Sequence, residues 1–407
     1  MSEQKNSPAQ GMTAAALGFM RDDNKNFSPL AVLTGVILLV GTILTILRFT
    51  QGLGAVTNLT DTHPWGMWIG FDLMCGVALA AGGYTTSAAC YLFGMKKYHS
   101  AVRPAILTAF LGYAMVVVSL LYDVGRPDRL ILAYPFVVQQ GTTSLLFEVG
   151  LCVLLYLTVL FLEFTPIPLE WLGFRKARNI AVKLTLTLTI LGVVLSTLHQ
   201  SSLGALFLIA PSKLHPLWYS PYLAVFFFVS SIAAGLSMVI FEGMLSHKKL
   251  HHRMGRTYLE EHPPLILSYA KAASLVLFGY FMVKVVGITA GDNWHLLPTP
   301  YGVWFLIELL GFVALPCFMF AMGSRNNDPG LIKFSAVLTV IGIVLNRLNI
   351  SMIAFNWHVP LDERYIPSWM EIVLSIYMVT CLILVFRFIV TRMPVFDEHP
   401  DFKEHHD

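Results

Sequence analysis

Ionisable side chains interrupt or end long apolar stretches at several places in this chain. They are Asp72, Asp123, Arg126, Glu148, His199, Lys284, Glu308 and Arg347. A charge inside a bilayer costs at least ~2.5–3.5 kcal/mol, so each of these residues is a candidate for function. Carboxylates and imidazoles donate and accept protons near neutral pH once burial adjusts their pKa values. Residues of these types therefore indicate proton exchange with a hydrogen-bonding ligand.

The stretches that carry these residues are long enough to cross a membrane. Of the 407 residues, 56% are hydrophobic and 13% are charged. A soluble domain carries roughly 25% charged residues. Because a helix crosses the hydrocarbon layer with ~20 residues, we expect an all-α polytopic membrane protein of about ten transmembrane helices. The predicted spans are 29–49, 65–92, 103–124, 141–164, 178–200, 219–246, 265–288, 300–322, 331–355 and 368–391.

Basic residues in the connecting segments indicate the orientation. If both termini are cytoplasmic, 18 Lys and Arg residues lie on the cytoplasmic side and 5 on the other side, and cytoplasmic loops carry such an excess of positive charge. Tryptophan and tyrosine collect at the opposite helix ends, as in aromatic belts. The sequence thus predicts cytoplasmic N- and C-termini, with most buried ionisable residues in the half of the bilayer away from the cytoplasm.

Two of the spans begin alike. Pro64–Leu73 and Pro300–Leu309 each open with proline, an aromatic residue and glycine. Each then places a carboxylate, Asp72 or Glu308, two turns (~10 Å) into the helix. An internal repeat would imply two related halves. Chance recurrence of a common interfacial helix start is the alternative, and the sequence leaves both open.

The chain has no pattern that would hold a redox centre of its own. Its 5 cysteines are far apart and form no CxxC motif, whereas iron–sulfur clusters need grouped thiolates. Of its 13 histidines, His199 alone lies in a predicted span, and we expect b-type haem in a bilayer to need paired histidines. We therefore predict no haem, no iron–sulfur cluster and no metal site in this chain.

A quinone headgroup is a ligand that suits these residues. Its two carbonyls need hydrogen-bond donors, and its reduction needs a route for two protons. The alternative is structural pairing between helices, such as Glu308 with Arg347. Glu163 and Glu242, near the cytoplasmic helix ends, are also compatible with merely bordering the interface.

A set of short motifs makes the chain similar to a known family. They are His63–Leu73, Val102–Ala105, Asp123–Arg126, Leu146–Glu148, Leu198–Gly204, His215–Trp218 and Ile240–Gly243. The similarity extends over nearly the whole chain, which resembles the NrfD family and, within it, the ten-helix branch. The sequence Leu-His-Gln-Ser-Ser-Leu-Gly at Leu198–Gly204 is especially specific.

The resemblance implies a membrane subunit of a respiratory oxidoreductase complex in the bacterial inner membrane. Such a subunit binds menaquinone and lies beneath a periplasmic iron–sulfur subunit that exchanges electrons with the quinone. Further implied partners are a molybdopterin-like or hydrogenase subunit, a multihaem cytochrome c and lipid, but no nucleic acid. The implied architecture is two four-helix bundles plus two peripheral helices. Its segments are 1–28 (cytoplasmic), 29–64 (first helix and periplasmic loop), 65–203 (first bundle), 204–356 (second bundle) and 357–407 (last helix and cytoplasmic tail).

The resemblance also implies where the ligand binds. Family quinone sites lie near the periplasmic face of the first bundle, which here corresponds to Trp68, Asp72, Asp123, Arg126, His199 and Ser202. The expected catalytic residues among them are Asp72, Asp123 and His199. Proton movement through one bundle or the other, proposed for some relatives, would use Glu148 and Glu163, or Lys284, Glu308 and Arg347.

An ion-coupled secondary transporter is the main alternative, because ten helices, a repeat and buried charges all fit one. A transporter would favour polar groups near the midplane beside broken helices, whereas here they are concentrated toward one face. A third alternative, an inert anchor for periplasmic redox proteins, leaves the buried charges unexplained.

Overall fold

The computed structural model describes residues 29–127, 145–250, 254 and 256–396. The predicted segment 1–28, the start of the fourth predicted span (141–144) and the tail 397–407 lie outside these residues. Within them, ten helices are long and apolar enough to cross a membrane. These residues form two isolated β-bridges and no β-strand. The all-α class and the ten spans are therefore confirmed, and the orientation of the termini stays a prediction.

Seven spans are built on one long helix each, and three are interrupted. The long helices are α2 (Pro29–Gln51), α5 (His99–Asp123), α7 (Leu145–Phe164), α9 (Arg175–Ala205), α10 (Leu223–Leu250), α11 (Arg256–Ala290) and α15 (Trp369–Arg392); α8 (Pro166–Leu172) follows α7. The second span comprises η2 (Trp68–Leu73), α3 (Met74–Leu79), α4 (Gly82–Ser87) and η3 (Ala88–Leu92). The eighth comprises α12 (Pro300–Leu306), η9 (Ile307–Ala314) and α13 (Leu315–Arg325), and the ninth α14 (Pro329–Leu348) and η10 (Asn349–Ile353).

Several helices run further than the apolar stretches predicted. α10 includes His247 and α11 includes His262. The expectation that His199 is the one histidine on a spanning helix is therefore wrong. The backbone gains its intrahelical hydrogen bonds in the interfacial region as well as in hydrocarbon, so a helix need not end where hydrophobicity ends.

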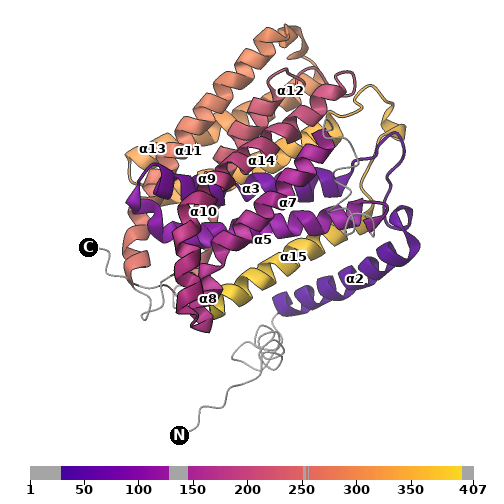
Figure 1. Ribbon diagram of the computed structural model, residues 1–407. Coiled ribbons are helices and arrows are strands. Elements are labelled where there is room, and N and C mark those ends of the chain that lie inside the picture. Colours follow the sequence, from indigo (N-terminus) through magenta and orange to yellow (C-terminus); the bar gives the residue numbers. More distant parts are fainter. Residues whose placement is uncertain (1–28, 128–144, 251–253, 255, 397–407) are drawn as a thin grey trace.

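Two rings of four helices make up the body of the protein, as predicted. The second span, α5, α7 and α9 contact one another in the first ring, and α10, α11, the eighth span and α14 do so in the second. α10 also packs against α9, α3 and α4 and so joins the rings. α2 and α15 lie side by side outside the first ring, with α15 against α5 (Figure 1).

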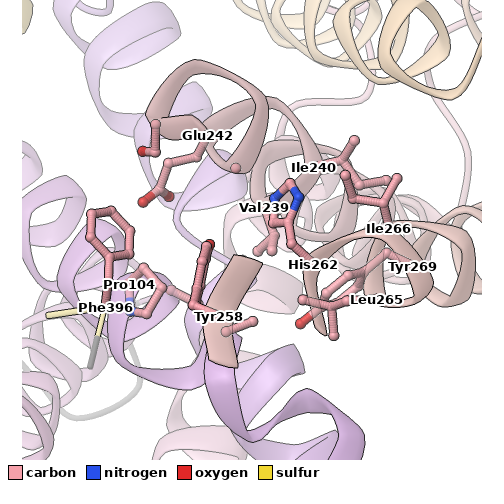
Figure 2. A pocket seen from close by; sticks show the side chains of 14 residues that line it. Pro104, Val239, Ile240, Glu242, Tyr258, His262, Leu265, Ile266, Tyr269 and Phe396 are labelled. Carbon is pink, nitrogen blue, oxygen red and sulfur yellow. The ribbon is translucent and has the colours of Figure 1, made fainter. Parts of the chain in front are cut away.

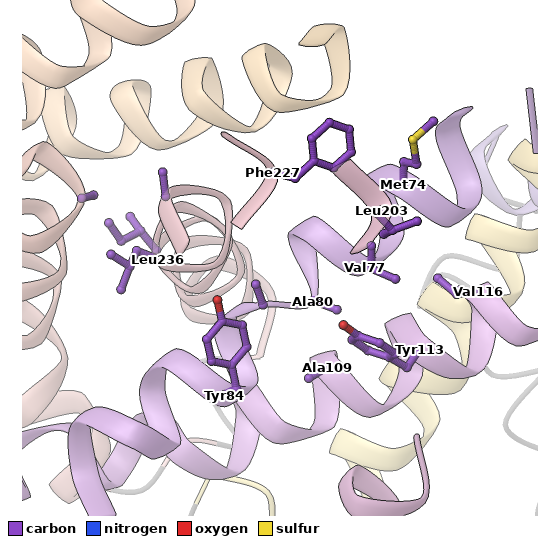
Figure 3. Close-up of a cluster of buried hydrophobic side chains, with 14 of the residues drawn as sticks. Met74, Val77, Ala80, Tyr84, Ala109, Tyr113, Val116, Leu203, Phe227 and Leu236 are labelled. Atoms are coloured by element: carbon purple, nitrogen blue, oxygen red, sulfur yellow. The ribbon is translucent and has the colours of Figure 1, made fainter. Parts of the chain in front are cut away.

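The two rings approach each other closely at a pair of glycines, Gly82 and Gly235. The second span is interrupted between α3 and α4, and a Cβ atom on Gly235 of α10 would lie 2.5 Å from backbone atoms of Ala81 and Gly82. Small residues allow such close backbone packing between membrane helices. Around this contact, buried side chains from both rings interdigitate, among them Val77, Ala80, Tyr84, Tyr113, Phe227 and Leu236 (Figure 3).

Three π-helical turns carry polar residues inside the bundles. η2 holds Asp72, η9 holds Glu308, and η10 holds Asn349 and Ser351. A π-helical turn gives up regular α-helical hydrogen bonding and is often found at functional sites. The two similar helix starts of the sequence thus both place their carboxylate in such a turn.

One end of the molecule gathers every tryptophan except Trp171, and we call it the tryptophan-rich end. The opposite end, where Lys96, Lys97 and Arg325 lie, is the basic end. At the tryptophan-rich end the buried His215 ring stacks on Tyr301, with ring centroids 4.6 Å apart. Its Nδ1 accepts the Leu217 backbone N–H at 3.2 Å. Burial lowers the pKa of His215 to about 4, so the folded protein keeps this ring neutral.

We expect Gly235→Ala to destabilise the protein, because the added methyl group would force the α10 and α4 backbones apart. Overpacking of this kind costs about 1–3 kcal/mol, which would be measured as a lower Tm of the purified protein. Gly279→Ala on α11 is the matched control, since a Cβ atom there meets nothing within 4 Å. Equal Tm values for the two variants would contradict this account of the glycine contact.

We expect the Tm to fall as the pH is lowered from about 7 to about 5. Below about pH 6.5 the unfolded chain takes up a proton on His215, whereas the folded protein does not. The free energy of unfolding is therefore highest above that pH and decreases as the pH falls toward about 4. His215→Phe, which keeps a stacked ring but cannot be protonated, should flatten the dependence. His295→Gln, at an exposed ring, should not; an unchanged slope in His215→Phe would refute the assignment.

Candidate functional site

Asp72 is fully buried and only half satisfied. Its Oδ2 accepts a hydrogen bond from the Ser375 hydroxyl of α15 at 2.6 Å, whereas Oδ1 has no partner among the described residues. One turn away, the Trp68 indole N–H donates to the Glu371 backbone carbonyl at 3.4 Å. Because Trp68 and Asp72 are four residues apart, as are Glu371 and Ser375, the second span and α15 make two successive contacts along their length.

Glu371 is a buried carboxylate that sequence reasoning missed. Its Oε1 accepts the backbone N–H groups of Asn58 and Ser368, both at 3.0 Å, and its Oε2 accepts the Tyr365 hydroxyl proton. Tyr365 Oη in turn accepts the Met67 backbone N–H at 3.0 Å. The available signal was the capping-box spacing of Ser368 and Glu371 just before an apolar run.

Arg48 of α2 is a second residue that was missed, and it supplies a buried cation beside Asp123. Its guanidinium donates to the carbonyls of Tyr122 at 2.7 Å and Val124 at 2.8 Å, at the C-terminal end of α5. A cation is favourable there because it meets the negative end of the helix dipole. Asp123 Oδ1 has no hydrogen-bond partner among the described residues, and the predicted site residue Arg126 is exposed just beyond the helix end.

His199 lies in the centre of the first ring, fully buried. Its Nδ1 lies 2.9 Å from the Leu195 backbone carbonyl, which can only accept, so this nitrogen carries the hydrogen. Nε2 of the neutral ring then accepts the Tyr113 hydroxyl proton. Tyr156 packs its ring edge-on against Tyr113, with centroids 4.6 Å apart.

Several polar atoms around His199 have no hydrogen-bond partner among the residues that the structure describes. The Gln200 amide N–H donates to the Val77 carbonyl at 2.9 Å, but its Oε1 is unpartnered within the described chain, as are Tyr156 Oη and Ser196 Oγ. Buried polar atoms normally find a hydrogen bond, often to an internal water molecule. The centre of the first ring is therefore suited to bind water.

The remaining carboxylates of the first ring lie on either side of this centre. Toward the tryptophan-rich end, the Ser202 hydroxyl donates to Glu148 Oε1 at 2.6 Å, and toward the basic end the Thr189 hydroxyl donates to Glu163 Oε1 at 3.0 Å. We call this set the polar column. Its members are Glu163, Tyr156, Tyr113, Ser196, His199, Gln200, Ser202 and Glu148.

The predicted ligand residues thus fall into two groups. Trp68, Asp72 and Asp123 lie against the peripheral helices α15 and α2, whereas His199 and Ser202 lie in the polar column. No hydrogen bond between described residues joins the two groups.

Glu308, in the second ring, is fully satisfied. Its carboxylate accepts the Trp218 indole N–H at 2.9 Å, the Asn346 amide at 2.6 Å and the Asn349 amide. Asn346 Oδ1 accepts from Arg347 at 3.0 Å. The direct ion pair of Glu308 with Arg347 that the sequence allowed is therefore not formed, because Asn346 lies between them.

The two buried cations of the second ring have aromatic and carbonyl partners. The Arg347 guanidinium donates to Ser230 Oγ at 2.8 Å and the Phe227 carbonyl at 3.2 Å, and it lies 3.8 Å from the Phe227 ring centroid. The Lys284 ammonium lies 4.9 Å from the Phe226 ring centroid. Cation–π contacts of this kind help a desolvated cation.

A hollow of about 150 Å³ opens at the tryptophan-rich end, beside the start of the second span and the end of α9. It is lined by Pro64, Trp65, Leu206, Phe207, Ile209, Ala210, Lys213 and Phe355. Flat aromatic walls with a single cation suit a flat, largely apolar ligand. Among the described residues, no group of three or more His, Cys, Asp or Glu side chains is arranged to hold a metal ion.

Known proteins resemble this chain along most of its length. A protein of Nitratidesulfovibrio vulgaris (strain Hildenborough) that carries no functional name is 64% identical over 390 residues, which is 95% of this chain and 100% of that protein. The "Probable Ni/Fe-hydrogenase 2 b-type cytochrome subunit" of Escherichia coli (strain K12) is 31% identical over 377 residues, 91% of this chain and 93% of that protein. The "Menaquinone reductase, integral membrane subunit" of N. vulgaris is 28% identical over 375 residues, 86% of this chain and 87% of that protein.

A family model extends over the two rings and leaves out the peripheral helices. The model described as "Polysulphide reductase, NrfD" matches residues 55–360, from the loop after α2 to the loop before α15. The match includes both helix starts with their π-helical carboxylates and the whole polar column. The chain therefore belongs to the NrfD family.

Proposed function

We propose that this protein is the quinone-interacting membrane subunit of a respiratory oxidoreductase complex in the bacterial inner membrane. It would exchange electrons between a periplasmic iron–sulfur subunit and menaquinone at the tryptophan-rich end. The names of its relatives support this proposal, since one is a menaquinone reductase subunit and another a hydrogenase subunit. A molybdopterin-like or hydrogenase subunit and a multihaem cytochrome c are the candidate further partners.

The observation that carries the proposal is the state of Asp72. In the fully buried Asp72 carboxylate, one oxygen has a hydroxyl donor and the other is unpartnered within the described chain. Glu308, at the matching position of the second ring, already has three donors. An unpartnered buried oxygen favours a ligand or a proton, whereas a carboxylate with three donors favours a fixed charge.

The chain's own residues would hold and move protons. Menaquinone accepts two electrons from the partner's iron–sulfur centre and two protons to become the quinol, or returns them in the reverse direction. Asp72 Oδ1 and Asp123 Oδ1 both have no hydrogen-bond partner among the described residues at the tryptophan-rich end, and Asp72 is the proposed proton donor and acceptor. The apolar hollow, with Trp65, Phe207 and Phe355 in its wall, would provide flat surfaces for the ring. Trp68 does not line this hollow and is buried against Tyr122.

The polar column is the better candidate for the proton route. It contains two carboxylates, His199, and three polar atoms without a partner within the described chain, which suits a hydrogen-bonded file of water. In the second ring, Glu308 is held by three donors and Lys284 lies among aromatic rings, and Arg347 Nε is buried without a hydrogen-bond partner within the described chain. We therefore assign proton movement to Glu148, Glu163 and their neighbours.

One observation favours an ion-coupled transporter as a second candidate. The second span is broken at Ala80–Ala81, in its middle, and discontinuous helices line many transporter sites. The break is packed against Gly235 of α10, however, which leaves no room for a solute beside it. The quinone function accounts for more of the buried groups.

The tagged protein, purified in mild detergent from its native membrane, should retain an iron–sulfur protein and menaquinone. A partner cluster must lie close to the quinone for electron transfer, so the intact complex should contain both, whereas this chain alone should keep the quinone after the partner is dissociated. Iron analysis, quinone extraction and visible spectra would measure this, and no haem Soret band should arise from this chain. A quinone-free preparation that transports a solute would instead support the transporter.

Alanine at Asp72 or His199 should abolish quinone turnover while the complex still assembles. Ser375→Ala, which removes the one donor to Asp72, should lower kcat about tenfold with little change in KM, and Ser375→Thr should restore it. Thr380→Ala is the control, because that hydroxyl bonds to its own helix at Ile376. Wild-type rates in both alanine variants would refute the assignment of the site.

A further inference from the structure

A second hollow lies at the basic end, between the two rings. It has a volume of about 20 Å³, which is room for one water molecule. Its polar lining comes from α10 and α11, with an apolar wall from α5 and the segment after α15 (Figure 2). The lining includes Pro104, Glu242, Ser246, Tyr258, His262 and Phe396.

Glu242 is the incompletely paired carboxylate of this hollow. Its Oε2 accepts the Thr108 hydroxyl proton, whereas Oε1 is buried without a partner among the described residues. The Glu242, Tyr258 and His262 side chains are turned toward the same space (Figure 2). A water molecule there would have the two or more polar partners that such molecules need.

Another buried carboxylate at the basic end shows what a structural role looks like. Glu170 Oε1 and Oε2 accept from Arg103 at 2.7 and 3.0 Å, and Oε1 also accepts from Arg178 at 3.3 Å. Both oxygens of Glu170 are thus compensated by cations. Among the described residues no cation pairs with Glu242, and a carboxylate whose free oxygen is buried and which has a single hydroxyl donor is poised to bind a proton.

The donor to Glu242 leads toward the polar column. Thr108 lies on α5, five residues before Tyr113, which is ~7.5 Å along the helix. The Tyr113 hydroxyl bonds to His199. One helix therefore connects the basic-end carboxylate with the centre of the first ring.

We propose that the hollow binds one ordered water molecule and that Glu242 is the group through which the protein exchanges protons with water at the basic end. The inference rests on the proposed function, because the protons exchanged are the two that menaquinone gains together with two electrons from the iron–sulfur partner. Each proton that Glu242 passes toward the polar column is replaced from water at the basic end. In the reverse reaction the same group releases protons there.

The test uses the whole complex reconstituted in liposomes, with proton uptake at the basic end and quinone turnover measured together. Glu242→Gln keeps the acceptor for Thr108 but cannot carry a proton, and we expect proton uptake to fall at least tenfold with assembly and Tm unchanged. Thr108→Val should lower uptake less. Glu261→Gln, at an exposed carboxylate on α11, is the matched control and should match the wild type.

The outcomes separate this inference from the proposed function. Wild-type proton uptake in Glu242→Gln overturns the inference and leaves the quinone function standing. An empty hollow, in a cryo-EM map of the complex that resolves other buried waters, also overturns it. Loss of proton uptake in Glu242→Gln, together with density for one water molecule beside Glu242 in the wild type, supports the inference. A wild-type complex that turns over no quinone with any electron donor refutes the proposed function itself.

Discussion

Hydrocarbon offers no hydrogen bonds, and this constraint governs where each polar atom of the protein lies. Most buried polar groups form their hydrogen bonds with other groups of the same chain. Thr34 and Thr339 donate to carbonyls four residues earlier on their own helices, and Glu170 is held between two arginines. The carboxylates that stay incompletely satisfied are therefore informative. In the described residues they include Asp72 and Asp123 at one end and Glu242 at the other, with unpartnered hydroxyl and amide oxygens near His199 between them.

The peripheral helices contribute more than lipid-facing surface. α2 and α15 lie outside the region matched by the family model, yet Arg48 inserts into the end of α5 and Ser375 is the partner of Asp72. Glu371 accepts hydrogen bonds from Asn58, in the loop after α2, and from Tyr365, in the loop before α15, and so connects the two loops. Helices α2 and α15 thus cover one side of Trp68, Asp72 and Asp123. The polar residues of these two helices are part of the proposed site.

The two similar helix starts illustrate how one local pattern acquires two roles. Asp72 and Glu308 occupy matching positions in π-helical turns, each four residues after a tryptophan. Around Glu308, α14 and η10 present Asn346 and Asn349, and with the Trp218 indole these make three donors that hold its charge. Around Asp72, α15 presents one serine. The difference lies in the neighbours and not in the motif itself.

The sequence by itself determined the class of the protein. Apolar runs of membrane-spanning length, separated by breakers and charges, predicted all ten spans, because the cost of exposing backbone to lipid leaves a helix as the available conformation. The motifs likewise predicted the family. They did not reveal Arg48 or Glu371, which read as an end-of-helix cation and a helix cap. They also did not show that Asp72 and His199 lie in separate groups, or that Asn346 separates Glu308 from Arg347. Such facts depend on which helix faces lie against each other, and that is decided by packing between segments as far apart in the chain as Asp72 and Ser375. A side chain's depth follows from its position along one helix, whereas its partner follows from the tertiary structure alone.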